Sequence, residues 1–231
     1  MSVRTLIATA FAIGLAANAG AATIVPGTSD PWLAGMPNGS TASLLDSAPG
    51  QSPVQVLLAF LPGDVLTFSA TGLTDHCDFG GCGLAGSDGD LLEPPTGHST
   101  GAENGIANVI APIDSLIGVF LGPAQPDSNP APGALDFSTP ALRDFASLSP
   151  LLQQPFFIGD GLRNDFTTLQ FFVVPVGATR LFLGTMDGFG WLNNVGELSV
   201  DVSATSVPEP ATIVLVGAGL FGAVRRRVRR R

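Results

Sequence analysis

The feature that most constrains the fold is a series of short apolar runs separated by turn-forming residues. In residues 197–203, ELSVDVS, apolar and polar side chains alternate strictly, as in a strand with one buried face. Residues 64–71, DVLTFSAT, alternate in the same way. Further apolar runs of strand length lie at 55–60, 116–121, 169–174 and 179–183. Because no segment keeps a 3.6-residue apolar period, the pattern predicts an all-β domain.

Glycine, proline, asparagine and aspartate punctuate these runs, and the chain has 29 glycines and 19 prolines. Several short strands with such turns and no long helix indicate a single β-sandwich of jelly-roll or galactose-binding-like type over residues 23–206. One short helix is predicted within 142–152. Residues 123–140 carry too many prolines for a central strand, so we expect a long surface loop there.

The N-terminal residues 1–22 have the order of features found in a secretory signal peptide. Arg4 supplies a positive start, an apolar run follows at 6–17, and Ala-x-Ala sites end the segment. A short buried helix is the alternative, but the three features occur in the order that secretion requires. We therefore predict export and removal of residues 1–22.

The C-terminal residues 207–231 read VPEPATIVLVGAGLFGAVRRRVRRR. The apolar stretch 211–224 is short for a stable membrane span, and the arginine cluster 225–231 is expected to stay on the cytoplasmic side. The string GAGLFG has neither the βαβ surroundings nor the downstream acid of a dinucleotide site. The tail resembles the PEP-CTERM sorting signal of Gram-negative bacteria, with Val207, Pro208, Glu209 and Pro210 as the motif. That resemblance implies an exosortase partner, a transient inner-membrane tether, processing near the motif and final placement on the surface or in the matrix.

The charge of residues 23–206 narrows the range of partners. Three arginines stand against eighteen acidic residues, a net charge of −15, and the chain has no lysine. Such a surface repels nucleic acid and anionic lipid, so we expect no nucleic-acid partner. It favours cations, although solubility alone also explains many acidic proteins.

The two cysteines lie in the sequence HCDFGGC. In an exported chain, Cys77 and Cys82 are predicted to form a disulfide, since two of the four intervening residues are glycines that let the chain turn back. A metal site made with His76 is the alternative, but a fourth ligand is missing from the pattern.

The stretch 186–196, MDGFGWLNNVG, allows two interpretations. Asp187, Asn193 and Asn194 offer one carboxylate and two amide oxygens, which are ligands that calcium prefers. Phe189 and Trp191 are then able to pack on the apolar face of a sugar whose hydroxyls complete the coordination of the ion. Alternatively, Asp-Gly and Asn-Asn only form the tight turn of a hairpin between 181–183 and 198–202.

No residue pattern recommends catalysis, so we predict that the protein is not an enzyme. The nucleophile-elbow pattern is absent, and neither histidine lies in a metalloprotease motif. The acidic residues Asp88, Asp90 and Glu93 are predicted to form a solvated loop rather than a second cation site.

The order of several segments resembles the calcium-dependent galactophilic (LecA-type) bacterial lectins. The segments are PGDV at 62–65, the loop GSDGD at 86–90, a following histidine, and Asp-to-Asn-Asn before the last strand. The resemblance implies calcium as the cofactor, with Asp187, Asn193 and Asn194 as side-chain ligands. It also implies backbone carbonyl ligands near Trp191 and at His76, and a sugar-contacting His98. The spacing from Asp187 to Asn193 is one residue shorter than in that family, and the tyrosine that the family uses is missing.

Three functional hypotheses follow. The first is an exported, calcium-dependent carbohydrate-binding domain that takes a galactose-like sugar or an exopolysaccharide. The second is a structural biofilm-matrix protein with no specific ligand. The third is a carbohydrate-active hydrolase.

Overall fold

The computed structural model of the chain describes residues 17–43, 45–77 and 81–206, and these consist almost entirely of strands and loops. Residues 17–206 form one compact unit with its own hydrophobic core, so we expect this part to fold without the flanking segments. The predicted all-β class is confirmed.

Fifteen strands are distributed over four sheets in the described part of the chain. They are β1 (Ala17–Ala19), β2 (Thr23–Pro26), β3 (Thr41–Ala42), β4 (Asp46–Ser47), β5 (Val54–Gln55), β6 (Val65–Asp75), β7 (Thr96–Gly97), β8 (Val109–Ala111), β9 (Leu116–Leu121), β10 (Leu135–Asp136), β11 (Ser147–Leu148), β12 (Phe156–Phe157), β13 (Phe171–Val173), β14 (Arg180–Thr185) and β15 (Val195–Thr205). The helical elements are the single turns η1 (Pro31–Leu33), η3 (Pro126–Ser128), α1 (Pro140–Arg143) and η4 (Trp191–Asn193).

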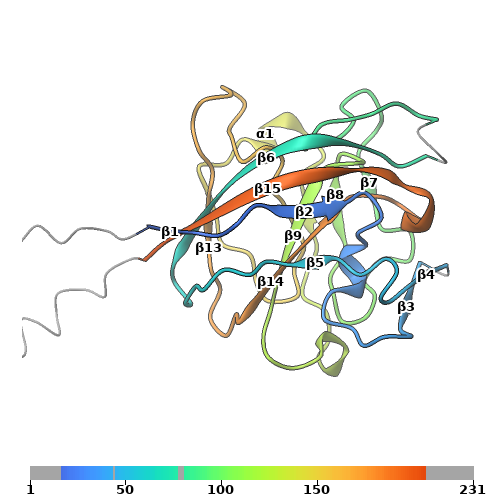
Figure 1. Cartoon of the computed structure of the whole chain (residues 1–231), viewed down its shortest axis with the longest axis horizontal. Helices are drawn as coiled ribbons and strands as arrows, with labels where there is room; N and C mark the ends of the chain where they lie inside the picture. Colours follow the sequence, from blue (N-terminus) through green and yellow to red (C-terminus); the bar gives the residue numbers. More distant parts are fainter. Residues whose placement is uncertain (1–16, 44, 78–80, 207–231) are drawn as a thin grey trace, which may run out of the picture. The chain divides into compact units, whose positions relative to one another are not determined.

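The largest sheet has six strands in the order β1-β15-β6-β13-β11, with β2 also paired to β15. Its two long strands, β6 and β15, pair antiparallel over all eleven residues of each (Figure 1). As predicted from the alternation, Leu198, Val200 and Val202 are buried on one face of β15. Leu66, Phe68 and Ala70 are likewise buried on β6.

The second sheet has the order β12-β9-β14-β5, all antiparallel. Its strand β9 matches the predicted run 116–121, and every residue of this strand is buried. A strand with both faces buried reads as a continuous apolar run, which is the pattern found there.

The two larger sheets contribute side chains to one hydrophobic core. The ring of Phe156 on β12 lies 5.5 Å, centroid to centroid, from the ring of Phe172 on β13. Side chains of β6 and β15 belong to the same buried cluster as those of β9 and β14. The more specific jelly-roll or galactose-binding-like topology stays a prediction.

Three local predictions need correction. The expected helix within 142–152 is only the single turn α1, which starts earlier and is followed by β11. Of the run 55–60, only Gln55 lies in the short strand β5; Val56 adds one backbone hydrogen bond to Leu181, and Leu57 is 88% exposed. The predicted loop 123–140 is largely irregular, but it contains η3 and the short strand β10, which pairs parallel to β8.

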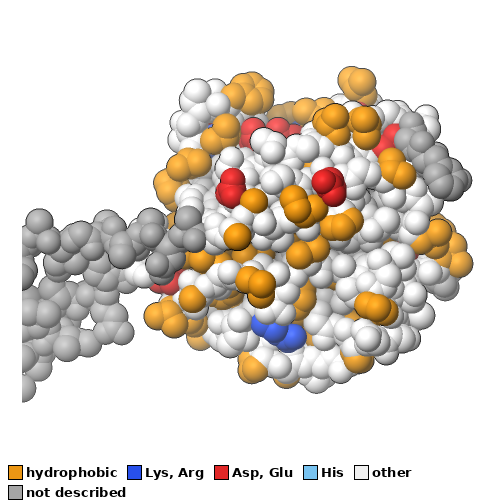
Figure 2. Space-filling view, in the orientation of Figure 1, with side chains coloured by type: hydrophobic (Ala, Val, Ile, Leu, Met, Phe, Trp, Pro, Cys, Tyr) orange, Lys and Arg blue, Asp and Glu red, His pale blue; other side chains and the backbone are white. Residues whose placement is uncertain are grey.

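The predicted signal peptide and sorting tail fall mostly outside the described residues. Ala17–Ala19, within the predicted signal peptide, pair with Ser203–Thr205 as β1 in the uncleaved chain, and the boundary at residue 22 stays a prediction. Figure 2 shows a face of the domain with few charged side chains and scattered apolar ones. This agrees with a chain in which only 13% of residues are charged.

Candidate functional site

The loop 186–194 connects β14 to β15 and therefore crosses from one large sheet to the other. The two strands are not paired with each other, so the alternative of a simple hairpin turn is wrong. The loop turns through Gly190, whose φ is +87°, and continues as the single turn η4. In Figure 1 this loop lies at the right-hand end of the domain, beside the short strands β3 and β4.

Asp187 opens the loop with one carboxylate oxygen engaged and the other without a partner. Its Oδ1 accepts hydrogen bonds from the backbone N–H groups of Gly188, at 2.6 Å, and Phe189, at 3.2 Å. Its Oδ2 is buried and has no hydrogen-bond partner among the described residues. Only 4% of the residue is exposed, so this oxygen is shielded from bulk water.

The two asparagines at the end of the loop also have side-chain oxygens that are buried and lack hydrogen-bond partners among the described residues. Asn194 donates from Nδ2 to the carbonyl oxygen of Gly27, at 3.2 Å, and this fixes its amide. Its Oδ1 and the Oδ1 of Asn193 are both buried and lack partners in the described part of the chain. Burial raises the pKa of the Asp187 carboxyl overall, and the side chain of Asn194 is among the groups that partly counter this rise.

Two aspartates from the N-terminal part of the chain complete one side of the loop. Asp46, on β4, accepts from the backbone N–H of Trp191 at 3.1 Å and from that of Leu192 at 2.8 Å, so it holds the start of η4. Asp30 caps η1 by accepting from the N–H of Trp32 through Oδ1, and its Oδ2 is buried without a partner among the described residues. Both side chains are completely buried.

A third aspartate, Asp114, is hydrogen-bonded to the first residue of the loop. Asp114 contacts Nδ1 of His76 through Oδ2 at 2.7 Å, while its Oδ1 is buried and unpaired within the described residues. Its backbone N–H donates to the carbonyl oxygen of Met186, at 2.7 Å, which ties it to the loop. The side chain of His76, which directly follows β6, therefore lies beside Asp114, and its charge acts on Asp187. The predicted role of its backbone carbonyl as a calcium ligand stays a prediction.

These aspartates raise one another's pKa values. Burial raises the pKa of Asp46 and that of Asp114 to about 6 each, and the charge of Asp187 adds to both. Burial also raises the pKa of Asp187, and it holds the pKa of Asp30 well above its usual range, where the charges of Asp46 and Asp187 contribute. Asp187 acts on all three others, so the negative charge is concentrated around the loop.

Five buried side-chain oxygens of this region thus lack a hydrogen bond in the described part of the chain: Asp30 Oδ2, Asp114 Oδ1, Asp187 Oδ2, Asn193 Oδ1 and Asn194 Oδ1. Buried polar atoms are normally paired, and each unpaired one costs about 1–3 kcal/mol. All five accept and none donates, so a cation that prefers oxygen satisfies them, whereas another acceptor does not. No three acidic, histidine or cysteine ligand atoms converge here within 4.8 Å among the described residues, so amide oxygens are essential to such a site.

The aromatic residues do not lie where a sugar-binding loop needs them. Trp191 is completely buried, donates from Nε1 to the carbonyl oxygen of Thr185, and packs 5.5 Å from Trp32. The predicted stacking of a sugar on its ring is therefore not possible in this arrangement. Phe189 is 45% exposed, and of the two aromatics only this one is open to a ligand.

His98 is also a core residue rather than an exposed contact. Its ring stacks on Trp32 at 3.9 Å, and only 3% of the residue is exposed. Both ring nitrogens are engaged, since Nδ1–H donates to the carbonyl oxygen of Gly101, at 2.8 Å, and Nε2 accepts from the hydroxyl of Ser43, at 2.6 Å. The sugar-contacting role that the resemblance implies does not fit this position.

The two histidines are expected to titrate on opposite sides of the ordinary histidine pKa of about 6.5. Burial lowers the pKa of His98, and the Gly101 carbonyl only partly counters this. Burial acts in the same direction on His76, but the hydrogen bond and charge of Asp114 outweigh it and raise the pKa of His76. An NMR titration of the imidazole signals, assigned with His76→Gln, checks this. A midpoint for His98 above that of His76 contradicts the assignment.

The structure also tests the two alternative cation sites, one at the cysteines and one at the acidic loop 88–93. Cys77 and Cys82 form the predicted disulfide, with their Cα atoms 5.4 Å apart, so their sulfurs are not available as thiolate ligands beside His76. The carboxylates of Asp88, Asp90 and Glu93 do not meet within 4.8 Å of one another, which rules out a cation site built from the three. Glu93 is exposed as predicted, whereas Asp88 is half-buried.

Comparison with known proteins identifies the tail. Residues 206–231 match the model of the PEP-CTERM protein-sorting motif. The motif implies an exported protein that an exosortase processes at the membrane. The predicted elements of this tail, Val207–Pro210, the apolar stretch 211–224 and the arginine cluster, lie outside the described residues. Among the described residues, no helix is long and apolar enough to cross a membrane. No curated protein matches the chain, so the comparisons give no support to the lectin resemblance.

Sequence reasoning missed Asp30, Asp46 and Asp114. Asp30 precedes Pro31, and this pair is a recognised start signal for a helical turn, which is the role of its Oδ1. No local pattern marks Asp46 or Asp114, because each reaches the loop only through the tertiary fold.

Proposed function

We propose that the exported domain binds a calcium ion at the loop 186–194, through the side chains of Asp187, Asn193 and Asn194, and that this ion serves carbohydrate binding. The observation that carries the proposal is the group of buried side-chain oxygens without hydrogen-bond partners at and around this loop. Calcium takes six to eight oxygen ligands from carboxylates, amides and carbonyls, and this donor set is of that kind.

The surrounding aspartates support a cation of charge two. Asp30, Asp46 and Asp114 lie close enough to Asp187 for its charge to disfavour the ionised form of each of them. A divalent ion reverses this repulsion, since it attracts every carboxylate within reach. Asp46 also fixes η4 through two backbone hydrogen bonds, which positions Asn193 before any ion binds.

The carbohydrate part of the proposal rests on the open side of the loop. Phe189 and Leu192 are 45% and 48% exposed, so an apolar patch borders the proposed ion. Vicinal hydroxyls of a galactose-like sugar or an exopolysaccharide are suited to open coordination positions, while the ring packs on Phe189. The sorting motif is consistent with this, because it implies that the protein is exported.

The experiment is a set of thermal melts of the domain, residues 17–206, in EDTA, in calcium and in magnesium. A ligand that binds only the folded state raises the melting temperature, and a concentration of about 100 times Kd adds about 2.7 kcal/mol. We expect a rise of about 5–10 °C in calcium and a much smaller one in magnesium, which demands stricter octahedral geometry. A glycan array in calcium and in EDTA then tests the sugar.

The matched variants are Asp187→Asn and Asp201→Asn. Asp187→Asn keeps an oxygen that accepts from the N–H groups of Gly188 and Phe189 but removes the charge, so it is expected to fold and to lose the calcium response. Asp201 is exposed on β15, and its amide variant is expected to respond as the original chain does. Superimposed melting curves in EDTA and calcium contradict the calcium site, and an undiminished response of Asp187→Asn contradicts its assignment.

A structural matrix protein without a specific ligand is the second candidate. The burial of Trp191 and His98 favours it, because two of the expected sugar contacts are inaccessible. It predicts no glycan signal in either buffer. A calcium response without glycan binding assigns the ion a structural role in such a matrix protein.

A further inference from the structure

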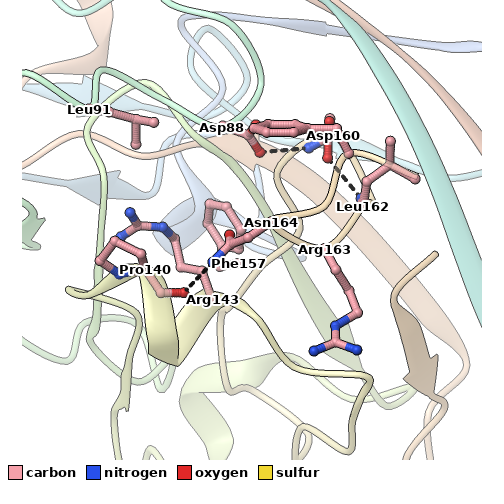
Figure 3. Close-up of a pocket in the computed structure, with 10 residues that line it drawn as sticks. Asp88, Leu91, Pro140, Arg143, Phe157, Asp160, Leu162, Arg163 and Asn164 are labelled. Carbon is pink, nitrogen blue, oxygen red and sulfur yellow. Dashed lines mark hydrogen bonds between the residues drawn. The ribbon is translucent and has the colours of Figure 1, made fainter. Parts of the chain in front are cut away.

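A separate pocket lies between α1, β12 and the loop 160–166 (Figure 3). Its volume is about 120 Å³, which is smaller than the 300 Å³ or more of pockets that enclose a drug-sized ligand. A space of this size suits one ring of a polymer that lies across the surface. None of the calcium-site residues lines it.

Two carboxylates form one side of the pocket. Asp88 accepts from the backbone N–H of Asp160 through Oδ1, at 3.0 Å, and Asp160 accepts from the N–H of Leu162 through its own Oδ1, at 2.8 Å. These bonds fix both side chains and leave each Oδ2 with no partner in the described part of the chain. Figure 3 shows Asp88 and Asp160 next to each other at one edge of the pocket.

One guanidinium group lies on the opposite side. Arg143 donates from Nη1 to the carbonyl oxygen of Phe137, at 2.8 Å, and its Cζ is 6.0 Å from the centre of the Phe157 ring. Arg163 also lines the pocket, but it makes a two-pronged ion pair with Asp144, with both N–O distances at 3.0 Å. Two carboxylates therefore face one guanidinium group that has no acidic partner of its own among the described residues.

The loop 160–166 holds an aromatic side chain at the mouth of the pocket. Phe166 is 72% exposed, and its φ is +57°, a conformation that is unfavourable for a bulky side chain. The loop is nevertheless well fixed, since Asp165 accepts from the N–H groups of Thr167 and Thr168, and Asn164 donates to the carbonyl oxygen of Pro140. Backbone strain of this kind persists where the surroundings enforce it, and it is concentrated at binding sites.

We propose that this pocket binds an amino sugar of a polysaccharide, with the ammonium group between Asp88 and Asp160, the ring against Phe166, and a hydroxyl oxygen accepting from Arg143. An exposed aromatic ring beside fixed polar groups is a combination that recognises a sugar's apolar face and hydroxyls. The excess of one carboxylate selects a cationic substituent over a neutral one and disfavours a uronate. Burial and the charge of Asp160 raise the pKa of Asp88, so a bound cation lowers the repulsion that the two carboxylates feel.

The test is an NMR titration of the 15N-labelled domain, residues 17–206, in EDTA with a trisaccharide of glucosamine. Matched trisaccharides of glucose and of glucuronate serve as comparisons. We expect amide shifts at residues 143, 160–166 and 88, with an affinity for the glucosamine trimer at least 10-fold above that for the glucuronate trimer. Because calcium is removed, a failure of the calcium proposal does not affect this result.

Three variants sharpen the outcome. Phe166→Ala is expected to weaken binding at least 10-fold, while Phe171→Ala, the same change at an exposed phenylalanine of β13 that does not line the pocket, leaves it unchanged. Asp160→Asn keeps the acceptor for the Leu162 N–H and is expected to reduce the preference for glucosamine over glucose at least 5-fold. The proposal is overturned if no shifts occur in the pocket, if the glucuronate trimer binds more tightly, or if Phe166→Ala binds as the original chain does with an unchanged melting temperature.

Discussion

In calcium-free buffer, the domain is expected to melt at a higher temperature at pH 5 than at pH 7.5. The cause is the group of buried aspartates around the loop 186–194. Burial raises the pKa of Asp46 and of Asp114 from 3.8 to about 6, and it raises the pKa values of Asp30 and Asp187 as well. In the unfolded chain these carboxyls keep ordinary pKa values near 3.9.

The direction follows from proton linkage. At pH 5 the folded state holds protons on these carboxyls that the unfolded state has released, so protonation stabilises the fold. This stabilisation is complete below the unfolded pKa of about 4 and is lost as the pH rises through the folded values near 6. His76, with a raised pKa, acts in the same direction, whereas His98, with a lowered pKa, opposes it below about pH 6.5. About 1 kcal/mol for each of Asp46 and Asp114 gives a difference of about 4–8 °C for a domain of this size.

Calcium is expected to reverse this dependence. The ion binds ionised carboxylates, so its stabilisation is larger at pH 7.5 than at pH 5. Differential scanning calorimetry at the two pH values, with and without calcium, gives the four melting temperatures. Asp46→Asn keeps an acceptor for only one of the two backbone N–H groups of η4, so it is expected to lower the melting temperature at both pH values. Because it also removes a titrating carboxyl, it is expected to reduce the pH dependence in EDTA, whereas Asp201→Asn leaves that dependence unchanged. A metal-free domain that is more stable at pH 7.5 than at pH 5 contradicts the raised pKa values of these carboxyls in the folded state.

Strand positions could be predicted where a strand's burial is reflected in its own sequence. β15 and β6 alternate because one face of each is buried, and β9 is continuously apolar because both faces are. The run 55–60 looked equally apolar, yet only its first residue, Gln55, lies in a strand, and Leu57 is exposed. Apolar composition alone did not tell these cases apart, because pairing depends on which strand lies alongside.

Some residues of the candidate site could likewise be predicted from the sequence, and others could not. Asp187, Asn193 and Asn194 lie within eight residues of one another, so their type and spacing were visible in the sequence. Asp30 and Asp114 reach the same loop from residues more than 70 positions before it in the chain. The burial of Trp191 was not visible either, because its partners Trp32 and Thr185 come from η1 and β14.

The largest loss of stability from a single substitution is expected for Phe172→Ala. Phe172 is completely buried on β13, and its ring contacts those of Phe68, Phe145 and Phe156, at centroid distances of 5.0, 5.6 and 5.5 Å. Phe68 belongs to the same sheet, whereas Phe156 lies on β12 of the other large sheet. Truncation of a buried phenylalanine costs about 3–5 kcal/mol, which lowers the melting temperature by roughly 6–20 °C in a domain of this size.

The neighbouring residue supplies the control. Phe171 precedes it on the same strand but points to the other side and is 42% exposed, so Phe171→Ala is expected to change the free energy of unfolding by less than about 1 kcal/mol. Urea denaturation of the two variants measures the difference. Because Phe172 does not touch the loop 186–194, its variant is expected to melt at a lower temperature but to show the same calcium-induced rise in melting temperature. Equal losses for the two variants contradict a common core between the two sheets. That core holds β14 in one sheet and β15 in the other, and so fixes the distance that the loop carrying Asp187 has to span.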